Sequence, residues 1–412
     1  MAKKILTAAV AVALLGMTAC STGTGTSGGS SDQGGKTINI GSVHPLSGSL
    51  AGVGGLMNDG AKLAVEDINA AGGIKSQNGA KLKLTDGDSK GNAQTGQSEA
   101  QRLISDGAVA LVGTYQSDVT QNVASVAERS KVPFVIDVAV DDKILAQGYK
   151  NTFRIQPDAS GMGTSGARDL LAMGKDTNTP VKTVSYIHIE GAFGGSVFAA
   201  FKKEAEAQGI TIAKEVTYSG SSFSDATTQV TDAASVHPDV IVVTGYYPDN
   251  LLIAKAISAL KPDVKAVFGI ASGAFDDNSF PADAGAAAAN ILSANYHYSA
   301  TSARAEDIRK RFQAKTGKSM ETAAMLSYQA VEVIAAGLEK SGSADPAKLR
   351  GAIAGISVTD PLLAFSGPIE FDERGQNKNA TVIVMQVQGG KVEQVFPKSF
   401  ATKDVVFPVV AK

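Results

Sequence analysis

The single cysteine of this sequence, Cys20, is the residue whose surroundings most clearly indicate a chemical modification. Two early lysines precede an apolar run over residues 5–17, and Thr18 and Ala19 place small side chains just before the cysteine. This order is typical of a bacterial export signal cleaved ahead of a lipidated cysteine. The alternatives are a plain signal peptide with a coincidental cysteine, or a short membrane helix, although a bilayer span needs roughly 20 residues. We expect residues 1–20 to be a lipoprotein signal peptide with Cys20 lipidation, which makes the protein extracytoplasmic and anchored to the cell membrane.

Patterns that would indicate catalysis or a cofactor are weak. The four histidines are scattered, and no two have the spacing of metal ligands. The sequence contains neither a P-loop lysine motif nor His-Glu-x-x-His. Of two Gly-x-Gly-x-x-Gly matches, the one at Gly23 follows no strand, and the one at Gly161 follows a very short β run that contains Pro157. We therefore expect a protein that is not an enzyme, with no cofactor and no metal site.

Charge and composition exclude further classes. Without Lys3 and Lys4, 36 basic residues face 40 acidic ones, a net charge near −4, which argues against nucleic acid as a partner. Residues 21–36 are almost entirely Ser, Thr and Gly and are expected to form a flexible linker. Because Cys20 is the only cysteine, packing alone must stabilise the core. The remaining length suits two domains.

After the linker, short β-like runs alternate with helical runs, which predicts parallel sheets with crossover helices. In a first series we expect strands at 37–43, 81–85, 109–112 and 133–138, and helices at 59–71, 93–104 and 119–129. Residues 153–155 look like a crossing, after which the pattern starts again. We expect strands at 183–189, 210–216, 240–243 and 266–270, and helices at 196–207, 226–234 and 250–260.

The last quarter of the chain is predicted to cross between the two series twice more. Residues 290–296 cross back, because the helices at 303–316 and 320–340 follow with no intervening strand. Residues 367–375 then cross again, and strands at 381–388 and 391–396 complete the second series. The predicted fold is α/β, with two doubly wound parallel-sheet lobes joined by three crossover strands. The N-terminal lobe comprises 37–155 plus 291–366, and the C-terminal lobe 156–290 plus 367–412.

Several motifs in order resemble a known family. Residues 40–48 read IGSVHPLSG and residues 60–74 read GAKLAVEDINAAGGI. The similarity continues through LISDG at 103–107, VPF at 132–134 and GYYP at 245–248, and it covers nearly the whole mature chain. The sequence closely resembles the branched-chain amino-acid-binding proteins, which are type I periplasmic binding proteins of ABC importers. The resemblance implies that two lobes close on a small solute in their cleft, that a cognate ABC permease is the partner, and that the protein is a monomer.

The resemblance also places ligand-binding candidates in the loops after the strands, where open α/β sheets bind ligands. After the third strand come Gln116, Ser117 and Asp118. Ser117 falls on the position at which the family's hydroxyl contacts the ligand carboxylate, although a plain helix cap would also explain it. After the fourth strand, Asp137 is followed by Ala139 and Val140, whereas the family's amino-acid binders carry Thr where Val140 stands. A valine side chain cannot hydrogen-bond a carboxylate or an ammonium group.

A second group is missing from the expected set. After the strand that ends at Gly269, the family's amino-acid binders carry an acid that pairs with the ligand's ammonium group. The segment here includes Ser272 and no carboxylate. Burying a cation without a partner costs several kcal/mol. An amino-acid ligand would therefore need another acid, such as Asp118, Asp137 or Glu190.

Aromatic residues complete the candidate set. Phe193 stands where many relatives place a Tyr that packs on the ligand, although it could also be a core residue near the hinge. Tyr246 and Tyr247 follow the strand that ends at Gly245, and we expect one of them to face the ligand and the other to pack.

The expected function is that of a solute receptor that delivers a small polar or amphipathic solute to the permease. Such a solute would be amino-acid-like, an amide or a small carboxylate. The alternative is a ligand-sensing module that signals to a partner, for which we would expect a transmembrane relay or an output domain. A third hypothesis is an extracellular hydrolase.

Overall fold

The computed structural model describes residues 36–220 and 222–409. The predicted signal peptide, its Cys20 and residues 21–35 of the predicted linker lie outside the described residues. Within those ranges, no helix has the combination of length and apolarity that crossing a membrane requires.

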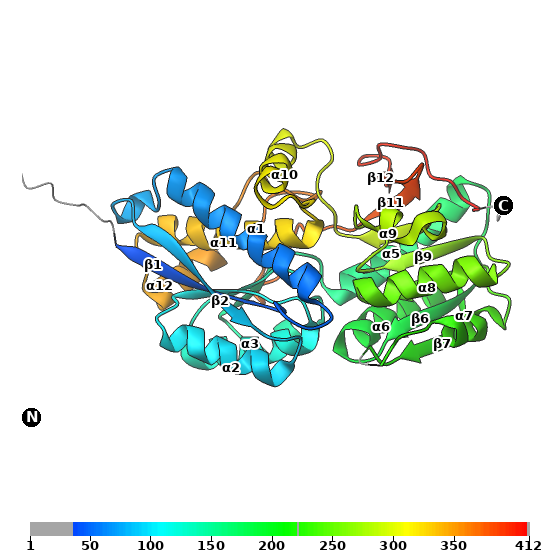
Figure 1. Cartoon of the computed structure of the whole chain (residues 1–412), viewed down its shortest axis with the longest axis horizontal. Helices are drawn as coiled ribbons and strands as arrows, with labels where there is room; N and C mark the ends of the chain where they lie inside the picture. The colour runs from blue at the N-terminus through cyan, green and yellow to red at the C-terminus, as the bar shows by residue number, and fades with distance from the viewer. Residues whose placement is uncertain (1–35, 221, 410–412) are drawn as a thin grey trace, which may run out of the picture. The chain divides into compact units, whose positions relative to one another are not determined.

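The first lobe is built on a five-stranded parallel sheet in the order β2-β1-β3-β4-β5. Figure 1 labels β1 and β2 of this sheet. Its strands are β1 (Thr37–His44), β2 (Lys81–Asp88), β3 (Ala110–Gly113), β4 (Phe134–Ile136) and β5 (Thr152–Arg154). One face is covered by α1 (Ala51–Ala70) and α11 (Thr322–Ser341), and the other by α2 (Ala93–Ser105) and α3 (Ser117–Ser130). The lobe also contains η1 (Lys75–Gln77), α4 (Lys143–Ala146), α10 (Ala303–Thr316) and α12 (Pro346–Ala354).

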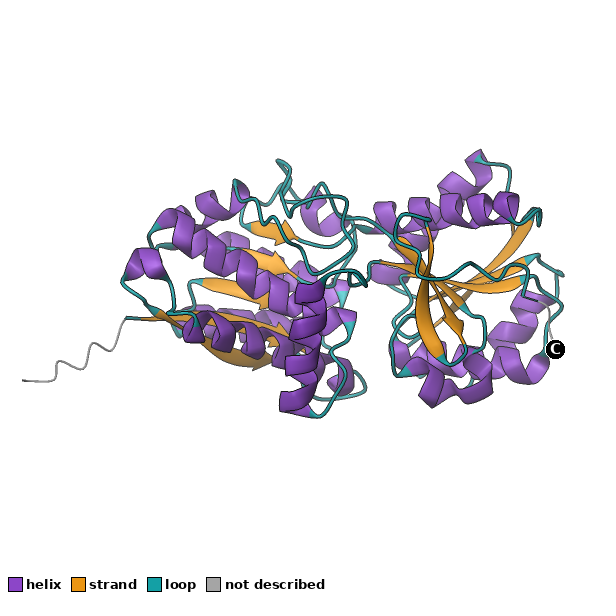
Figure 2. Ribbon diagram, turned by 90° about the horizontal axis from the view of Figure 1, so that it is seen from above, coloured by secondary structure: helices purple, strands orange, loops and turns teal. Residues whose placement is uncertain are grey.

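The second lobe is built on a seven-stranded sheet in the order β12-β11-β10-β9-β8-β6-β7. Figure 2 shows strands and helices in both lobes, with the strands in orange. The parallel strands of the second sheet are β6 (Thr183–Ile189), β7 (Thr211–Tyr218), β8 (Val240–Thr244), β9 (Ala266–Ile270) and β10 (Leu292–Asn295). The strands β11 (Ile383–Gln388) and β12 (Lys391–Phe396) add an antiparallel edge. The helices are α5 (Ala159–Asp176) and α6 (Ala192–Ala207) on one face, and α7 (Thr227–Ala234) and α8 (Tyr247–Leu260) on the other, with α9 (Phe280–Ala284) and η2 (Gly285–Ala288) beside α8.

The predicted α/β class with two doubly wound lobes is confirmed. The chain passes between the lobes after β5, after β10 and after α12. The second passage starts later than the sequence pattern predicts, because residues 292–295 pair in parallel with β9 and belong to the second sheet. Leu292 and Ala294 are fully buried there. The predicted N-terminal lobe, which includes residues from 291, therefore begins its second segment too early.

Two glycines explain why α1 starts at Ala51, earlier than the predicted residue 59. A Cβ atom on Gly54 would lie 2.0 Å from the carbonyl oxygen of Pro45, and one on Gly60 would lie 2.1 Å from the carbonyl oxygen of Ala324 in α11. Glycine has a low helix propensity, so the pattern discouraged a helix here. The absence of Cβ atoms lets the first turn of α1 pack against the backbone of Pro45, and the middle of α1 pack against the start of α11.

Arg154 joins two of the passages between the lobes. Its side chain is 1% exposed, and Nη1 donates to the carbonyl oxygens of Val140 (2.8 Å) and Asp141 (2.9 Å). Its Nε donates to Oε1 of Gln376 at 2.7 Å, and its backbone N donates to the carbonyl of Gly375. One buried guanidinium group thus satisfies acceptors from the segment after β4 and from the third passage.

Candidate functional site

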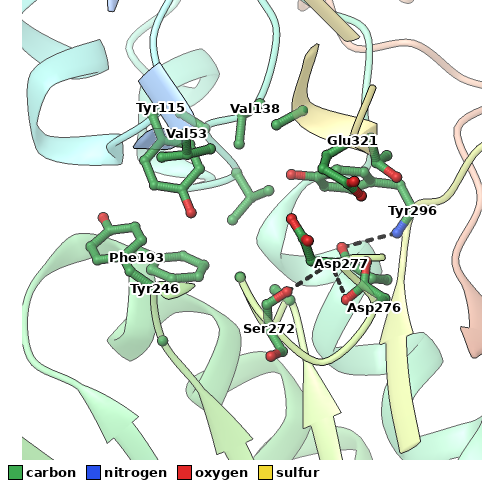
Figure 3. Close-up of a pocket in the computed structure, with 18 of the residues that line it drawn as sticks. Val53, Tyr115, Val138, Phe193, Tyr246, Ser272, Asp276, Asp277, Tyr296 and Glu321 are labelled. Atoms are coloured by element: carbon green, nitrogen blue, oxygen red, sulfur yellow. Dashed lines mark hydrogen bonds between the residues drawn. The ribbon is translucent and has the colours of Figure 1, made fainter. Parts of the chain in front are cut away.

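Loops from both lobes enclose a cavity of about 70 Å³ (Figure 3). The first lobe contributes α1 and the segments after β3 and β4, and the second lobe contributes the start of α6 and the segments after β8 and β9. The passage after β10 and the first turn of α11 line the remainder. The strands of each parallel sheet point their carboxyl ends at this place, which is where such sheets bind ligands.

Aromatic rings from the two lobes meet on one side of the cavity. Tyr115 of the first lobe lies 5.2 Å from Tyr246 of the second, measured between ring centroids. Phe193 stacks on the other side of Tyr246 at 5.2 Å with an interplanar angle of 25°. Burial raises the pKa of both tyrosines above the usual range, so the phenols stay neutral. The rings form an apolar wall, and their contact holds the lobes together at this point.

Carboxyl groups gather on the opposite side of the cavity (Figure 3). Asp276 is buried, and its oxygens accept hydrogen bonds from the hydroxyl of Ser293 (2.7 Å) and the side-chain amide of Asn295 (3.2 Å to each oxygen). Burial, with a smaller contribution from the negative charge of Glu321, raises the pKa of Asp276 to about 7. Both effects disfavour the charged form.

Two further acids lie beside Asp276. The carboxylate of Asp277 accepts from the backbone N (2.8 Å) and the hydroxyl (2.5 Å) of Ser279. Burial, followed by the charge of Glu321, raises the pKa of Asp277 to about 7. Oε2 of Glu321 accepts from the backbone N (3.0 Å) and the amide (2.9 Å) of Asn278, whereas Oε1 is buried and has no hydrogen-bond partner. None of these three acids is among the residues predicted from the sequence.

Among the described residues, the ionisable side chains that line the cavity are all acidic. Its lining, as far as the structure describes the chain, includes these three acids and no Lys, Arg or His. Over residues 36–220 and 222–409, no group of three His, Cys, Asp or Glu side chains is arranged to hold a metal ion.

Comparisons with known proteins agree with this architecture. Residues 37–391 match the family model described as periplasmic binding protein. The chain belongs to the periplasmic binding protein family. It is 28% identical over 382 residues to the Leu/Ile/Val-binding protein homolog 8 of Brucella abortus, covering 90% of this chain and 93% of that protein. The predicted resemblance to branched-chain amino-acid-binding proteins is thus confirmed.

Solved structures show the same fold. The leucine-binding protein LivK of Thermotoga maritima superposes with a TM-score of 0.75 at 23% identity, covering 87% of this chain and 97% of that chain. LivJ of Streptococcus pneumoniae in complex with isoleucine gives 0.75 at 24% identity, covering 90% and 100%. A solute-binding protein of R. palustris in complex with benzoate gives 0.76 at 22% identity, covering 87% and 95%.

Six of the residues predicted from the sequence line the cavity of this periplasmic binding protein. They are Ser117, Ala139, Val140, Phe193, Tyr246 and Ser272. The hydroxyl of Ser117 accepts from the backbone N of Asp141 at 3.3 Å, and the hydroxyl of Ser272 donates to Oδ1 of Asn250 at 2.9 Å. Both hydroxyls therefore already have partners within their own lobes.

Tyr246 and Tyr247 point in different directions, as expected of neighbouring residues at the start of a helix. Tyr246 precedes α8 and lines the cavity. Tyr247 is the first residue of α8, half-buried, and its hydroxyl donates to Asp283 and lies 3.1 Å from the hydroxyl of Ser279. The structure therefore does not bring Tyr247 to the cavity.

Four other candidates also lie outside the cavity lining. The amide of Gln116 donates to the carbonyl of Gly91 at 3.1 Å. Asp118 is exposed in the first turn of α3, and Glu190 is exposed after β6. Asp137 is fully buried after β4. Asp118, Asp137 and Glu190, the acids predicted as possible ammonium partners, do not line the cavity. The end of a strand determines where the following loop lies, but it does not determine the direction in which each side chain points.

Asp137 belongs to a buried Ser–His–Asp chain. Oγ of Ser42 lies 2.9 Å from Nδ1 of His44, and Nε2 of His44 lies 2.7 Å from Oδ2 of Asp137. All three residues are at most 1% exposed, and Oγ of Ser42 donates to Asn58 of α1. The hydroxyl of Ser327 in α11 also donates to Asp137. The chain crosslinks the first sheet to its covering helices and does not present its serine to the cavity.

Proposed function

We propose that this protein is the solute receptor of an ABC importer, which captures a small solute between its lobes and delivers it to a permease without catalysis. We further propose that it is tethered to the outer face of the cell membrane through acyl chains on Cys20. The observation that carries the proposal is the cavity, whose walls come from both lobes and from the passages between them.

A site of this kind couples binding to the arrangement of the lobes. A solute that contacts both lobes binds best when they are closed, so binding shifts the population toward the closed form. A permease can then distinguish the loaded receptor from the empty one. The relatives with isoleucine and benzoate bound support a small organic solute.

The test is a thermal-shift screen of the purified mature chain against a library of small metabolites. A compound at one hundred times its Kd should stabilise the protein by about 2.7 kcal/mol. The Tyr246→Ala variant, which removes a cavity wall, should lose that shift while melting cooperatively. If no compound shifts the melting temperature, or if the shift survives in Tyr246→Ala, the cavity is not a solute site.

Delivery needs its own measurement. A radiolabelled form of the solute found in the screen should enter wild-type cells and not cells that lack this protein. Equal uptake in both, together with intact binding in vitro, would favour the alternative of a sensing module.

A further inference from the structure

We propose that the solute is a small organic cation, an ammonium or amidinium group on an apolar body without a carboxylate, whose charged end binds between Asp276, Asp277 and Glu321. The inference rests on the proposed solute-binding function and narrows the chemical class of the solute. It differs from the amino acids and carboxylates that the resemblance suggests.

The first support is the unsatisfied oxygen of Glu321. The side chain is only 7% exposed, and Asn278 holds Oε2 with two hydrogen bonds, so the orientation of the carboxylate is fixed. Oε1 is left buried without a donor, although this residue lines the cavity. Buried polar atoms are almost always paired, and an unpaired one is costly. A donor on the solute would complete the site.

The second support is the charge balance. The three acids lie close enough for the charge of Glu321 to act on the two aspartates, and the described residues of the lining provide no positive charge. Carboxylates in such a setting repel an anionic solute and attract a cationic one, and the low dielectric of a buried site strengthens both effects. The raised pKa values of Asp276 and Asp277 are what two desolvated carboxyl groups without a cation should show.

The third support is the opposite wall. The rings of Tyr115, Phe193 and Tyr246 face the acids across the cavity and suit an apolar body (Figure 3). The described residues of the lining offer no cationic group to a solute carboxylate. The hydroxyl of Ser117, which accepts from the backbone N of Asp141, could donate one neutral hydrogen bond, and Val140 offers no hydroxyl. A carboxylate on the solute would be buried without a cationic partner.

The test uses matched compounds that differ only in their charged groups. Isopentylamine, leucine and 4-methylpentanoate form one set, and phenethylamine, phenylalanine and 3-phenylpropanoate form another, with benzamidine as an amidinium probe. Binding to the mature chain is measured by isothermal titration calorimetry at pH 8. We expect at least one cation to bind, with an affinity at least tenfold above that of its matched amino acid or of any carboxylate.

Substitutions then locate the charged end. Glu321→Gln and Asp277→Asn keep the side-chain shape, and each should weaken amine binding by about ten- to a hundredfold, the usual effect of losing a charge-assisted hydrogen bond. Glu206→Gln, on the exposed surface of α6, is the matched control and should leave the affinity unchanged. Thermal unfolding of each variant shows whether the lobes remain folded.

Different results overturn different claims. Three results would refute the cation inference and leave solute binding intact. The first is that an amino acid or a carboxylate binds more tightly than every cation, and the second is that a library compound without a cationic nitrogen binds while the cations do not. The third is that Ca²⁺ or Mg²⁺ occupies the acids until EDTA is added. An affinity for amines that survives both substitutions also refutes the cation inference. If neither these probes nor the metabolite library binds, the proposed function itself fails.

Discussion

Replacing Asp276 by asparagine removes the carboxyl charge and keeps the side-chain shape. The substitution should therefore show how much stability the protein loses by burying this charge. Burial raises the pKa of this carboxyl group from 3.8 to about 7 in the folded protein. The folded state therefore keeps its proton up to about pH 7, whereas the unfolded chain loses its proton near pH 4. Between these values the folded state binds more protons, so the free energy of unfolding falls as pH rises. Above pH 7 the loss amounts to about 4 kcal/mol.

Asparagine has no proton to lose, so the variant should escape this cost. It should instead lose about 1 kcal/mol, because its amide nitrogen cannot accept from the side chain of Asn295. At pH 8 the apo variant should be more stable than wild type by about 3 kcal/mol. At pH 5 the cost in the wild type is only about 1–2 kcal/mol, so the two proteins should be nearly equal.

The other titratable groups around Asp276 do not obscure this comparison. Nε2 of His297 lies 3.2 Å from the carbonyl oxygen of Asp276, and burial lowers the pKa of His297 to about 4, below the tested range. Burial raises the pKa values of Tyr115 and Tyr296 far above it. Asp277 titrates in the same range, and the charge of Asp276 contributes to its raised pKa. Removing that charge should therefore relieve part of the cost at Asp277 as well, which acts in the same direction as the effect at Asp276. Glu321 is present in wild type and variant alike.

The assay is urea and thermal unfolding of the apo proteins at pH 5 and pH 8. Asp263→Asn, at an exposed position after α8, is the control and should change neither value. If Asp276→Asn destabilises the protein equally at both pH values, the carboxylate is not desolvated and the reasoning is refuted. The same variant should bind amines more weakly, so that stability rises as function falls.

Three further outcomes follow from features outside the acids. Tyr246→Ala removes the ring that contacts Tyr115 and Phe193, and calorimetry should show solute affinity falling about tenfold or more while the protein still unfolds cooperatively. Unchanged affinity would discredit the aromatic wall. Arg154→Ala leaves several buried acceptors unpaired, and denaturation should show a loss of about 3 kcal/mol or more; the exposed Arg168→Ala is its control, and equal effects would contradict the assigned network. Cys20→Ser should move the protein from the membrane fraction to the soluble fraction of broken cells, and a variant that stays bound would refute lipidation.

Local pattern predicted most of the elements because each buried strand here is a short apolar run with turn residues at its ends. The predicted strand at 183–189 and that at 391–396 coincide with β6 and β12. The pattern failed where distant contacts decide. Residues 292–295 resemble a connecting segment in isolation, and pairing with β9 on one side and β11 on the other makes them a strand of the second sheet. The first turns of α1 were missed because its glycines have a low helix propensity, which close packing overrides.

The residues of the candidate site that follow strands could be predicted from the sequence. The residues that reach the cavity only because the two lobes come together could not. Phe193, Tyr246 and Ser272 follow strands of the second lobe and line the cavity. Asp276 lies six residues after β9, so a search for acids in the loops after strands would have found it. Glu321 precedes a helix of the other lobe, and nothing in its local sequence indicates that Asn278 would hold it at the cavity.

The contact between Gly60 and the carbonyl of Ala324 implies that a substitution outside the cavity could change the volume of the cavity. Val53 and Leu56 of α1 and Ala323 of α11 form one wall, and the spacing of these two helices is set by a position with no side chain. An added methyl group there would force the helices apart. Selection for receptors with larger solutes should therefore recover changes at this glycine as well as at residues that touch the cargo.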